Sequence, residues 1–502
     1  MDNSDKSLSR ELGLAECVTI AAGAVIGVGL FTVGSSQVGI AGGSIVIATL
    51  FSLLLVIWPA FIYGELGAAL PLSGGTYAYA KRALGWPVAI FTSWQYILAM
   101  IGIAAGEALA FANYLNHLLW ALGVSETVHI DARISACALV LLFTVINYRG
   151  IEFSGRLQNI FMFFFWSASF LWFALELRHL DLSNYVSVFG GLPSEVSVLA
   201  KMIVMTWWCY AGFETIVGMG SEVKFPQINI PRAMTIVPLL VFAVNALWQF
   251  FLVGLTPPAD LTAIATSEAP FVDGMKAAGI VGLPVILLCL VITLGGDFST
   301  MIPCTGGSAR YIYTSALDGC LPAVFSKVHP RFRSPFVAII GVGVIAMLVI
   351  LTNSILIISA MCAFSHMLCY IIGYISYLAL RIREPNLHRP YHAPAGMLGA
   401  IVSIVAYLIL MLFAVDRVAI WFNLAWSALS VVYIVFWVVL PRRHPPSESV
   451  DVELLALKTR EPTRGERLEL DSQYRLWLTI AILAAIAGLG LFVIGFFYHA
   501  AT

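Results

Sequence analysis

Long apolar runs dominate this sequence and limit what it can fold into. Each is long enough, at about 20 residues, to cross a bilayer as an α-helix, which satisfies its own backbone hydrogen bonds there. Hydrophobic residues make up 60% of the chain and charged residues 11%, against roughly 45–50% and 25% in soluble domains. We therefore predict an all-α membrane protein with twelve transmembrane helices and a thirteenth at the C-terminus. The runs lie at about 14–39, 43–69, 87–120, 133–148, 156–177, 196–220, 233–255, 279–304, 335–353, 355–381, 397–416, 419–440 and 476–498.

The positions of the lysines and arginines predict the orientation of these helices. With the N-terminus in the cytoplasm, most of the 27 Lys and Arg residues fall on the inner side, as is typical of cytoplasmic loops. We expect a multi-pass protein of a cell membrane, plasma or bacterial inner. Its segments are a cytoplasmic N-terminus (1–13), a ten-helix core (14–381), helices 11 and 12 (397–440), a cytoplasmic linker (441–475) and an extra transmembrane helix (476–498).

The first apolar run has an unusual density of glycine. Gly23, Gly27 and Gly29 fall within seven residues, and each glycine costs a helix interior roughly 1 kcal/mol relative to alanine. Backbone at bilayer depth can leave the helix only where it lines a cavity, and the free N–H groups at the positive end of a half-helix suit a carboxylate. We therefore interpret the segment from Gly23 to Phe31 as a helix break that forms a binding site.

A second interrupted helix is expected five spans later if the chain is an inverted repeat of two five-helix halves. The sixth span offers one at residues 207–214, where Gly212 is followed by Gly218 and Gly220. Glycine in membrane helices also serves close packing between helices. Two interrupted helices in matching positions nevertheless favour a secondary transporter.

Five ordered motifs resemble those of the amino acid–polyamine–organocation superfamily of permeases, over roughly residues 10–440. The segment from Gly23 resembles the family signature G-x-x-I-G-x-G-I-F, and the segment from Pro71 resembles P-x-S-G-G-x-Y. The resemblance implies a LeuT-like fold, a 5+5 inverted repeat that alternates between outward and inward openings around helices one, three, six, eight and ten. The motifs lie at 23–31, 71–77, 221–232, 310–322 and 383–390.

The same resemblance implies roles for residues at the two breaks. In such carriers the N–H groups of the first break hold the substrate carboxylate, and carbonyls of the sixth-helix break take the amino group. An aromatic side chain of the sixth helix covers the site; here that position is Trp208, which as a membrane tryptophan could also serve packing alone. The matching substrate-binding positions are Ala24, Val25, Ile26, Gly27 and Gly29 in the first helix, and Trp208, Cys209, Tyr210 and Ala211 in the sixth.

One departure from the family leaves the coupling ion open. Many proton-coupled or exchanging members resemble one another in carrying a lysine in the fifth helix, where sodium-driven relatives hold sodium, and this chain places Phe165 there. Ser299 and Thr300 of the eighth helix supply oxygen ligands that suit sodium. Alternatively, these hydroxyls bond neighbouring helices and no ion is bound, as in an exchanger or facilitator.

Ionisable residues inside the spans are functional candidates because burying them costs on the order of 2.5–3.5 kcal/mol by insertion scales. Glu107 in the third helix is a candidate for substrate binding, and would favour a cationic substrate or free amine if it faces the pocket. Glu214, His366 and Asp297 are candidates for coupling or gating by protons or cations. Each could also be a satisfied packing residue.

The function predicted is secondary active transport of an amino acid or related small amine by alternating access. An exchanger or facilitator without ion coupling, and a sensor that binds without transporting, stay open as alternatives. No metal-ligand spacing, Walker motif or catalytic constellation stands out, so an enzyme, an ATP-driven pump and a resident cofactor other than coupling Na⁺ or H⁺ are not expected. Small substrates and lipid are the expected partners, without nucleic acid. The loop from Trp120 to Arg133 lacks a cysteine, so no disulfide-linked heavy chain is expected.

Overall fold

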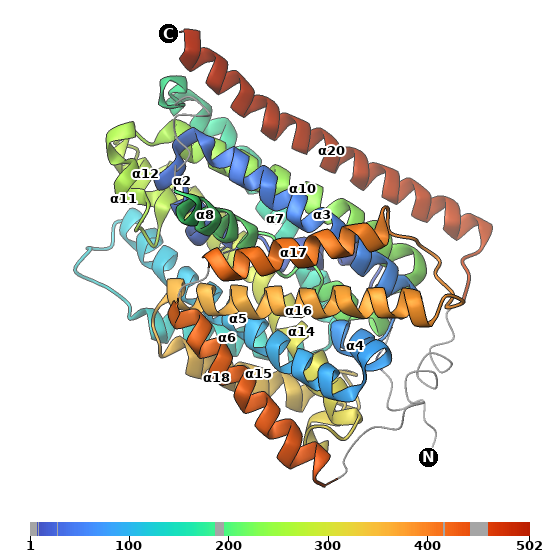
Figure 1. Ribbon diagram of the computed structural model, residues 1–502. Coiled ribbons are helices and arrows are strands. Elements are labelled where there is room, and N and C mark those ends of the chain that lie inside the picture. The colour runs from blue at the N-terminus through green and yellow to red at the C-terminus, as the bar shows by residue number, and fades with distance from the viewer. Residues whose placement is uncertain are drawn as a thin grey trace.

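The computed structural model describes residues 8, 10–27, 29–185, 195–414, 417–441 and 460–501. Over these residues the chain is helical, apart from turns and two isolated bridges that join Leu12 to Val223 and Ser73 to Met219. The helices form a bundle in which most of the central segments run along a common direction (Figure 1). The predicted all-α architecture is confirmed.

Most predicted spans correspond to one continuous helix. Within the described ranges, eight helices are long and apolar enough to cross a membrane, and five shorter apolar helices accompany them. The full count of twelve plus one crossings stays a prediction. The continuous helices are α3 (Ile45–Ala69), α5 (Trp86–Ala121), α6 (Ala132–Tyr148), α7 (Ile151–Glu176), α10 (Pro226–Leu255), α15 (Phe336–Ile350), α16 (Ile355–Arg383) and α17 (Gly396–Ala414).

Four predicted spans are interrupted or change their helical winding. A π-helix, with its wider turn, commonly marks a functional position. The interrupted spans are the first, with α1 (Leu14–Gly23), the π-helix η2 (Gly29–Gly34) and α2 (Val38–Ala41); the sixth, with α8 (Val196–Trp208) and α9 (Thr215–Gly218); the eighth, with α13 (Leu283–Leu290), the π-helix η8 (Val291–Asp297) and α14 (Phe298–Leu317); and the twelfth, with α18 (Arg417–Tyr433) and the π-helix η10 (Ile434–Val439).

Short elements connect the long helices. The segment α4 is amphipathic and follows the second span, and α11 and α12 lie between the seventh and eighth spans. The short elements are α4 (Thr76–Leu84), α11 (Leu261–Ile264), α12 (Pro270–Ala277) and the 3₁₀ turns η3 (Gly42–Ser44), η4 (Leu177–His179), η5 (Leu182–Asn184), η6 (Gly220–Glu222), η7 (Pro258–Asp260) and η9 (Ala323–Ser326).

The last helix, α20 (Arg464–Ala501), begins earlier than the predicted thirteenth span and includes the end of the predicted linker. It lies along α10 at the edge of the bundle (Figure 1). Near its start Asp471 pairs with Arg232 of α10, whose guanidinium also lies 5.0 Å from the Tyr474 ring centroid. The rest of the linker, 442–459, where a short amphipathic helix was expected around Val452, lies outside the described residues.

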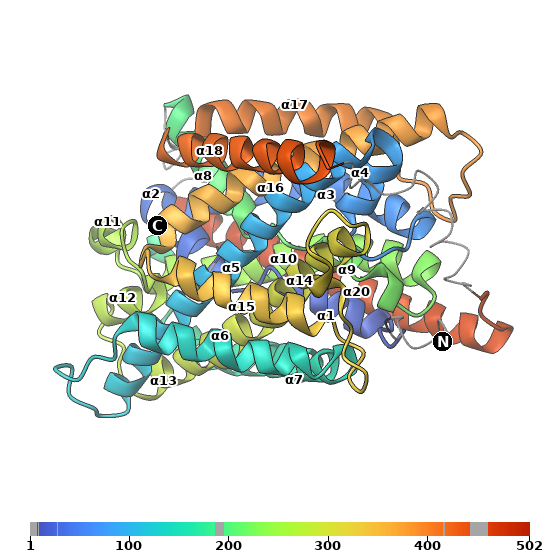
Figure 2. The same cartoon turned by 90° about the horizontal axis from the view of Figure 1, so that it is seen from below.

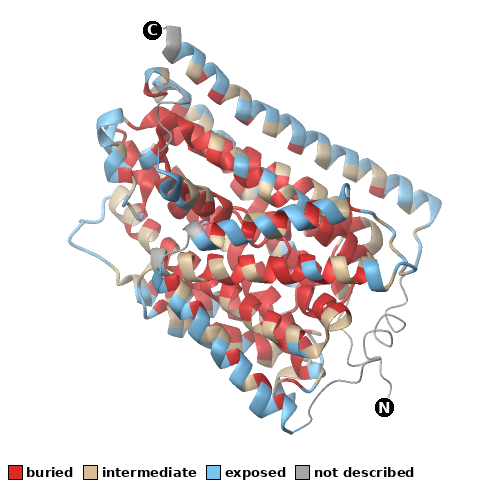
Figure 3. Ribbon diagram, viewed as in Figure 1, coloured by how far each residue is buried: buried red, intermediate tan, exposed pale blue. Residues whose placement is uncertain are grey.

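The packing separates a buried centre from an apolar outer surface. Helices α1, α10 and α14 are largely buried, whereas α6, α7, α17, α18 and α20 expose apolar side chains outward (Figure 3). The pair α6 and α7 and the pair α17 and α18 lie at opposite edges of the bundle (Figure 2). An apolar outer surface around a packed polar interior suits a protein surrounded by lipid.

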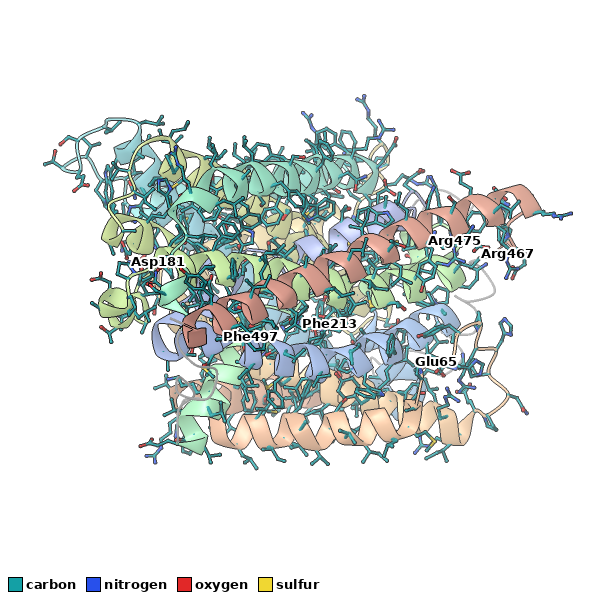
Figure 4. All side chains as sticks on the ribbon, turned by 90° about the horizontal axis from the view of Figure 1, so that it is seen from above. Glu65, Asp181, Phe213, Arg467, Arg475 and Phe497 are labelled. Carbon is teal, nitrogen blue, oxygen red and sulfur yellow. The ribbon has the colours of Figure 1, made fainter. Side chains whose placement is uncertain are left out.

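The two ends of the bundle differ in charge. Figure 4 shows Glu65, Arg467 and Arg475 toward one end and Asp181 and Phe497 toward the other, with Phe213 of the sixth-helix break between them. We call the end with Glu65 and Arg467 the basic end. Arg467 and Arg475 at this end belong to the linker that is predicted to be cytoplasmic.

Candidate functional site

The first helix is broken as predicted. Helix α1 ends at Gly23, residues 24–27 form a turn, and the π-helix starts at Gly29; Val28 lies outside the described residues. The N–H groups of Ala24, Val25 and Ile26 donate to carbonyls of the last turn of α1. In this arrangement those three donors are satisfied within the chain, while no backbone hydrogen bond from the Gly27 N–H is recorded among the described residues.

Gly27 leaves room at the break for a close side-chain contact. The carboxyl group of Glu107, from the middle of α5, lies so close that a Cβ atom at residue 27 would be 2.2 Å from Glu107 Oε2. Real Cβ atoms essentially never come that close to another heavy atom, so any larger residue at position 27 would displace the Glu107 carboxyl group from the break. Glu107 is buried and thus points at the break instead of at an unrelated helix.

Asp297 brings a second carboxyl group to the same place. It is the last residue of η8, is fully buried, and interacts electrostatically with Glu107. Neither Asp297 oxygen makes a well-formed hydrogen bond with the residues that the structure describes. Because burying a carboxylate without a counter-charge is costly, this pair favours a proton, a cation or a positively charged ligand beside Gly27.

The sixth span is broken at residues 209–214, again as predicted. Gly212 adopts φ 113°, and a Cβ atom there would lie 2.7 Å from the Ala24 carbonyl oxygen, so both its conformation and its contact require glycine. The carbonyls of Cys209, Tyr210 and Ala211 accept no backbone hydrogen bond recorded among the described residues. Like the carbonyls at a helix C-terminus, they suit a donor or a cation.

The two breaks touch each other directly. Cys209 Sγ donates to the Gly29 carbonyl over 3.0 Å, and the indole of Trp208 lies 3.3 Å from the Cβ position of Gly29. Trp208 is buried and adjoins the first break, as a lid would. The backbone groups expected to bind the two ends of an amino acid therefore lie side by side.

Glu214 and His366 form a buried hydrogen-bonded cluster next to the second break. His366 Nε2, from α16, lies 3.0 Å from Glu214 Oε1, and the Tyr370 hydroxyl donates to Glu214 Oε2. The Gly212 N–H donates to that same hydroxyl. Both residues had been predicted as separate coupling candidates, and the structure brings them together.

The hydroxyls proposed as sodium ligands already have acceptors. Thr300 Oγ1 donates to the Gly23 and Ile26 carbonyls at 2.8 and 3.0 Å, and Ser299 Oγ donates to the Gly296 carbonyl. The first-break carbonyls that could coordinate a cation thus receive a hydrogen bond instead. Phe165 packs against Gly295, where an added Cβ atom would lie 2.8 Å from the Phe165 Cβ atom.

A glutamine missed in the sequence occupies the space between α1, α7 and α14. Gln158 Nε2 donates to the Thr19 carbonyl. A Cβ atom added at Gly23 would lie 2.0 Å from this nitrogen and would also approach the Ser299 carbonyl oxygen. Its neutral amide therefore supplies donors beside the carbonyls of the first break. The signal available in the sequence was a polar residue, Gln158, within an apolar span.

The basic end is closed by buried ion pairs that sequence reasoning missed. Arg310 was interpreted as part of the positive-inside signal, but it is buried in α14 and binds Glu222 through two nitrogens at 2.7 and 2.8 Å. Lys81 binds Asp318, which also accepts from the Tyr77 hydroxyl. Three of the five family motifs, at 71–77, 221–232 and 310–322, thus meet at this end. Their contacts could not be predicted because the motifs lie far apart in the sequence.

Glu65 joins the same end through α16 and the loop that follows. Two arginines pair with its buried carboxylate: Arg381 lies 2.6 Å and Arg389 3.3 Å from its carboxyl oxygens. The Ala393 N–H donates to it as well. This network ties α3 to α16 and keeps the basic end shut.

The opposite end of the bundle is hollowed next to the loop before α12. A cavity of about 370 Å³ there is lined by residues of α5, α6 and the loop before α12, and Asn113 donates to Glu268 inside it. The Thr32 hydroxyl of η2 donates to the Glu268 carbonyl, which connects this region to the first break. Side-chain and backbone hydrogen bonds from Arg133 lower the pKa of Asp131 at the rim to about 2, so that its carboxylate stays charged.

Comparison with known proteins identifies the family. A family model described as amino acid permease matches residues 12–439. The chain belongs to this family. It is thereby an amino acid permease homologue of the amino acid–polyamine–organocation superfamily, whose members transport amino acids or related substrates and share the LeuT-like fold.

Individual relatives are distant but extend over most of the chain. A methylthioribose transporter of Bacillus subtilis is 26% identical over 66% of this chain and 73% of its own. A branched-chain amino acid permease of the same organism is 22% identical over 87% of this chain and 92% of its own. The mouse Asc-type amino acid transporter 1 is 25% identical over 81% of this chain and 77% of its own. The family and these relatives are transporters and not enzymes, and the apolar helices indicate a multi-pass membrane protein.

Proposed function

We propose that this permease is a secondary active transporter of an amino acid or a related small amine across the cell membrane. The observation that carries the proposal is the direct contact of the two helix breaks, Gly212 against the Ala24 carbonyl and Cys209 against Gly29. Backbone donors of one broken helix then lie next to backbone acceptors of the other, as recognition of a carboxylate and an amino group in one site requires. The closed basic end and the cavity at the other end suit one state of an alternating-access cycle.

The first break favours a substrate that carries a positive charge. Glu107 lies against Gly27, and Asp297 lies beside Glu107. A cationic side chain or amine there would neutralise one of two adjacent buried carboxyl groups, which a neutral side chain cannot do. A neutral amino acid remains the second candidate, because relatives include a permease named for branched-chain amino acids.

For the coupling ion we propose the proton. Glu214 has a histidine and a tyrosine as hydrogen-bond partners, a cluster that can take up and release a proton within the membrane. Sodium is the weaker candidate, since Thr300 donates to the carbonyls that would coordinate it. Exchange without a coupling ion is the alternative that transport assays distinguish.

The proposal is tested with purified protein in liposomes that contain a panel of unlabelled neutral, cationic and anionic amino acids and small amines. Saturable counterflow of the labelled compound is expected for one chemical class. An inward proton gradient should drive accumulation, whereas accumulation driven only by sodium would contradict proton coupling. Counterflow without any driven accumulation would establish an exchanger, and binding without counterflow a sensor.

A further inference from the structure

A second cavity, of about 340 Å³, lies away from the helix breaks. It is formed where α6 turns into α7 and where the loop before α15 approaches that turn. Gly155 of α7 packs on Leu12, whose N–H donates to the Glu222 carbonyl, so the cavity lies at the basic end. Its volume is within the range of small-ligand sites, roughly 300–1,000 Å³.

Guanidinium groups dominate the lining of this cavity. Four arginines and one carboxylate, Glu152, are among the lining residues, and Glu152 pairs with Arg156 at 2.5 Å. The 26-residue helix α7 begins at the cavity and adds the positive potential of its N-terminus. Such a set favours a phosphate group, because guanidinium matches phosphate in shape and charge. The arginines are Arg149, Arg156, Arg331 and Arg333.

The loop that carries two of these arginines is held in place by the fold. The N–H groups of Arg331 and Phe332 donate to His329 Nδ1, and the Ser334 hydroxyl donates to the Tyr148 carbonyl over 2.7 Å. At Gly150 a Cβ atom would lie 2.4 Å from the Phe332 carbonyl oxygen, so the two turns fit closely. The cavity is therefore preorganised, which lowers the cost of binding.

The helices beside the cavity present apolar side chains outward. Phe153 at the rim is 39% exposed, and farther along the same two helices Val145, Ile160 and Phe163 are 48%, 60% and 71% exposed. Figure 2 shows α6 and α7 together along one edge of the bundle. Acyl chains lying on this face would place a lipid headgroup beside the arginines.

We propose that this cavity binds the phosphate of an anionic phospholipid. The ligand chemistry is a phosphate ester, and the adjoining apolar face selects a lipid over a soluble phosphate. Occupancy would hold the turn between α6 and α7 against the loop before α15. The site does not depend on which substrate the permease carries.

The experiment measures retention of phosphatidylglycerol by native mass spectrometry of the full chain, titrated in detergent, with phosphatidylcholine as the reference lipid. The variant Arg149→Gln/Arg331→Gln removes two cavity charges, and Arg464→Gln/Arg467→Gln removes two exposed charges of α20. At about fivefold for each juxtamembrane arginine, the cavity variant should bind phosphatidylglycerol about 30-fold more weakly. The α20 variant should match the wild type.

A further variant and a soluble ligand complete the test. Glu152→Gln removes the one carboxylate of the cavity and should tighten phosphatidylglycerol binding, which a folding defect cannot imitate. Equal retention by the cavity and α20 variants would overturn the site. Displacement of the lipid by millimolar inorganic phosphate or glycerol 3-phosphate would overturn the assignment to a lipid and identify a soluble phosphate ligand.

Discussion

The two helix breaks adjoin, yet their carboxyl groups have opposite surroundings. At the sixth-helix break both oxygens of Glu214 are hydrogen-bonded, to His366 and Tyr370. At the first break Glu107 presses against Gly27, and neither oxygen of the neighbouring Asp297 has a well-formed hydrogen bond among the described residues. Both carboxyl oxygens of Glu214 are thus satisfied within the protein, although His366 Nδ1 has no hydrogen-bond partner among the described residues, whereas the oxygens of Asp297 are left for something that binds.

This difference suggests a division of roles. A hydrogen-bond network that satisfies both oxygens of a carboxyl group holds that group in place, and its members can exchange a proton. An incomplete one costs free energy until a ligand or ion arrives, and that cost favours binding. We infer that the first break selects the substrate and that the Glu214 cluster responds to protons.

The largest effect should come from removing the contact at the first break. Gly27→Ala places a Cβ atom 2.2 Å from Glu107 Oε2, and relieving such overpacking typically costs about 1–3 kcal/mol, so counterflow should fall by up to about 100-fold. Gly490→Ala, where no heavy atom lies within 4 Å of the added Cβ, is the control and should transport normally. Equal rates for the two variants would remove Gly27 from the site.

A smaller effect is expected in substrate selection. Glu107→Gln keeps the shape but removes the charge, so the apparent affinity for cationic substrates should fall about tenfold or more, the cost of losing a buried charge partner. Competition assays against labelled substrate measure it, with the exposed Glu126→Gln as control. Unchanged preference among cationic and neutral compounds would show that Glu107 does not recognise charge.

The pH dependence should separate the second break from the first. With Glu214→Gln the proton-driven accumulation of substrate should be lost while counterflow continues, because the amide of glutamine does not take up or release a proton near neutral pH. Glu176→Gln alters another glutamate–histidine pair, in which Glu176 at the end of α7 lies 2.9 Å from His179 of η4, and should keep the wild-type pH profile between about pH 5 and 8. A Glu214→Gln protein that still accumulates substrate would place the proton elsewhere, with Asp297 the next residue to test.

The smallest effect concerns sodium. Thr300 already donates to the Gly23 and Ile26 carbonyls, so replacing sodium by potassium should change uptake by less than about twofold. Initial rates in the two salts at equal ionic strength give the measurement. Strong sodium dependence that is lost in Thr300→Val would instead assign these oxygens to a sodium site.

The sequence alone determined the fold class and the positions of both breaks. Apolar runs of spanning length permit only helices in a bilayer, and clustered glycines at 23–29 and at Gly212 mark where those helices are interrupted. These are local properties of the chain, set by hydropathy and backbone conformation. For that reason they could be predicted without any tertiary contact.

Only the tertiary structure decided which polar groups are partners. Glu214 and His366 lie far apart in sequence and meet because α16 packs beside the sixth-helix break, and Arg310 is buried because Glu222 reaches it from another helix. Hydropathy gives each charge a depth in the membrane but no direction around its helix. The pairing of charges across helices, and with it the difference between the two breaks, follows from packing.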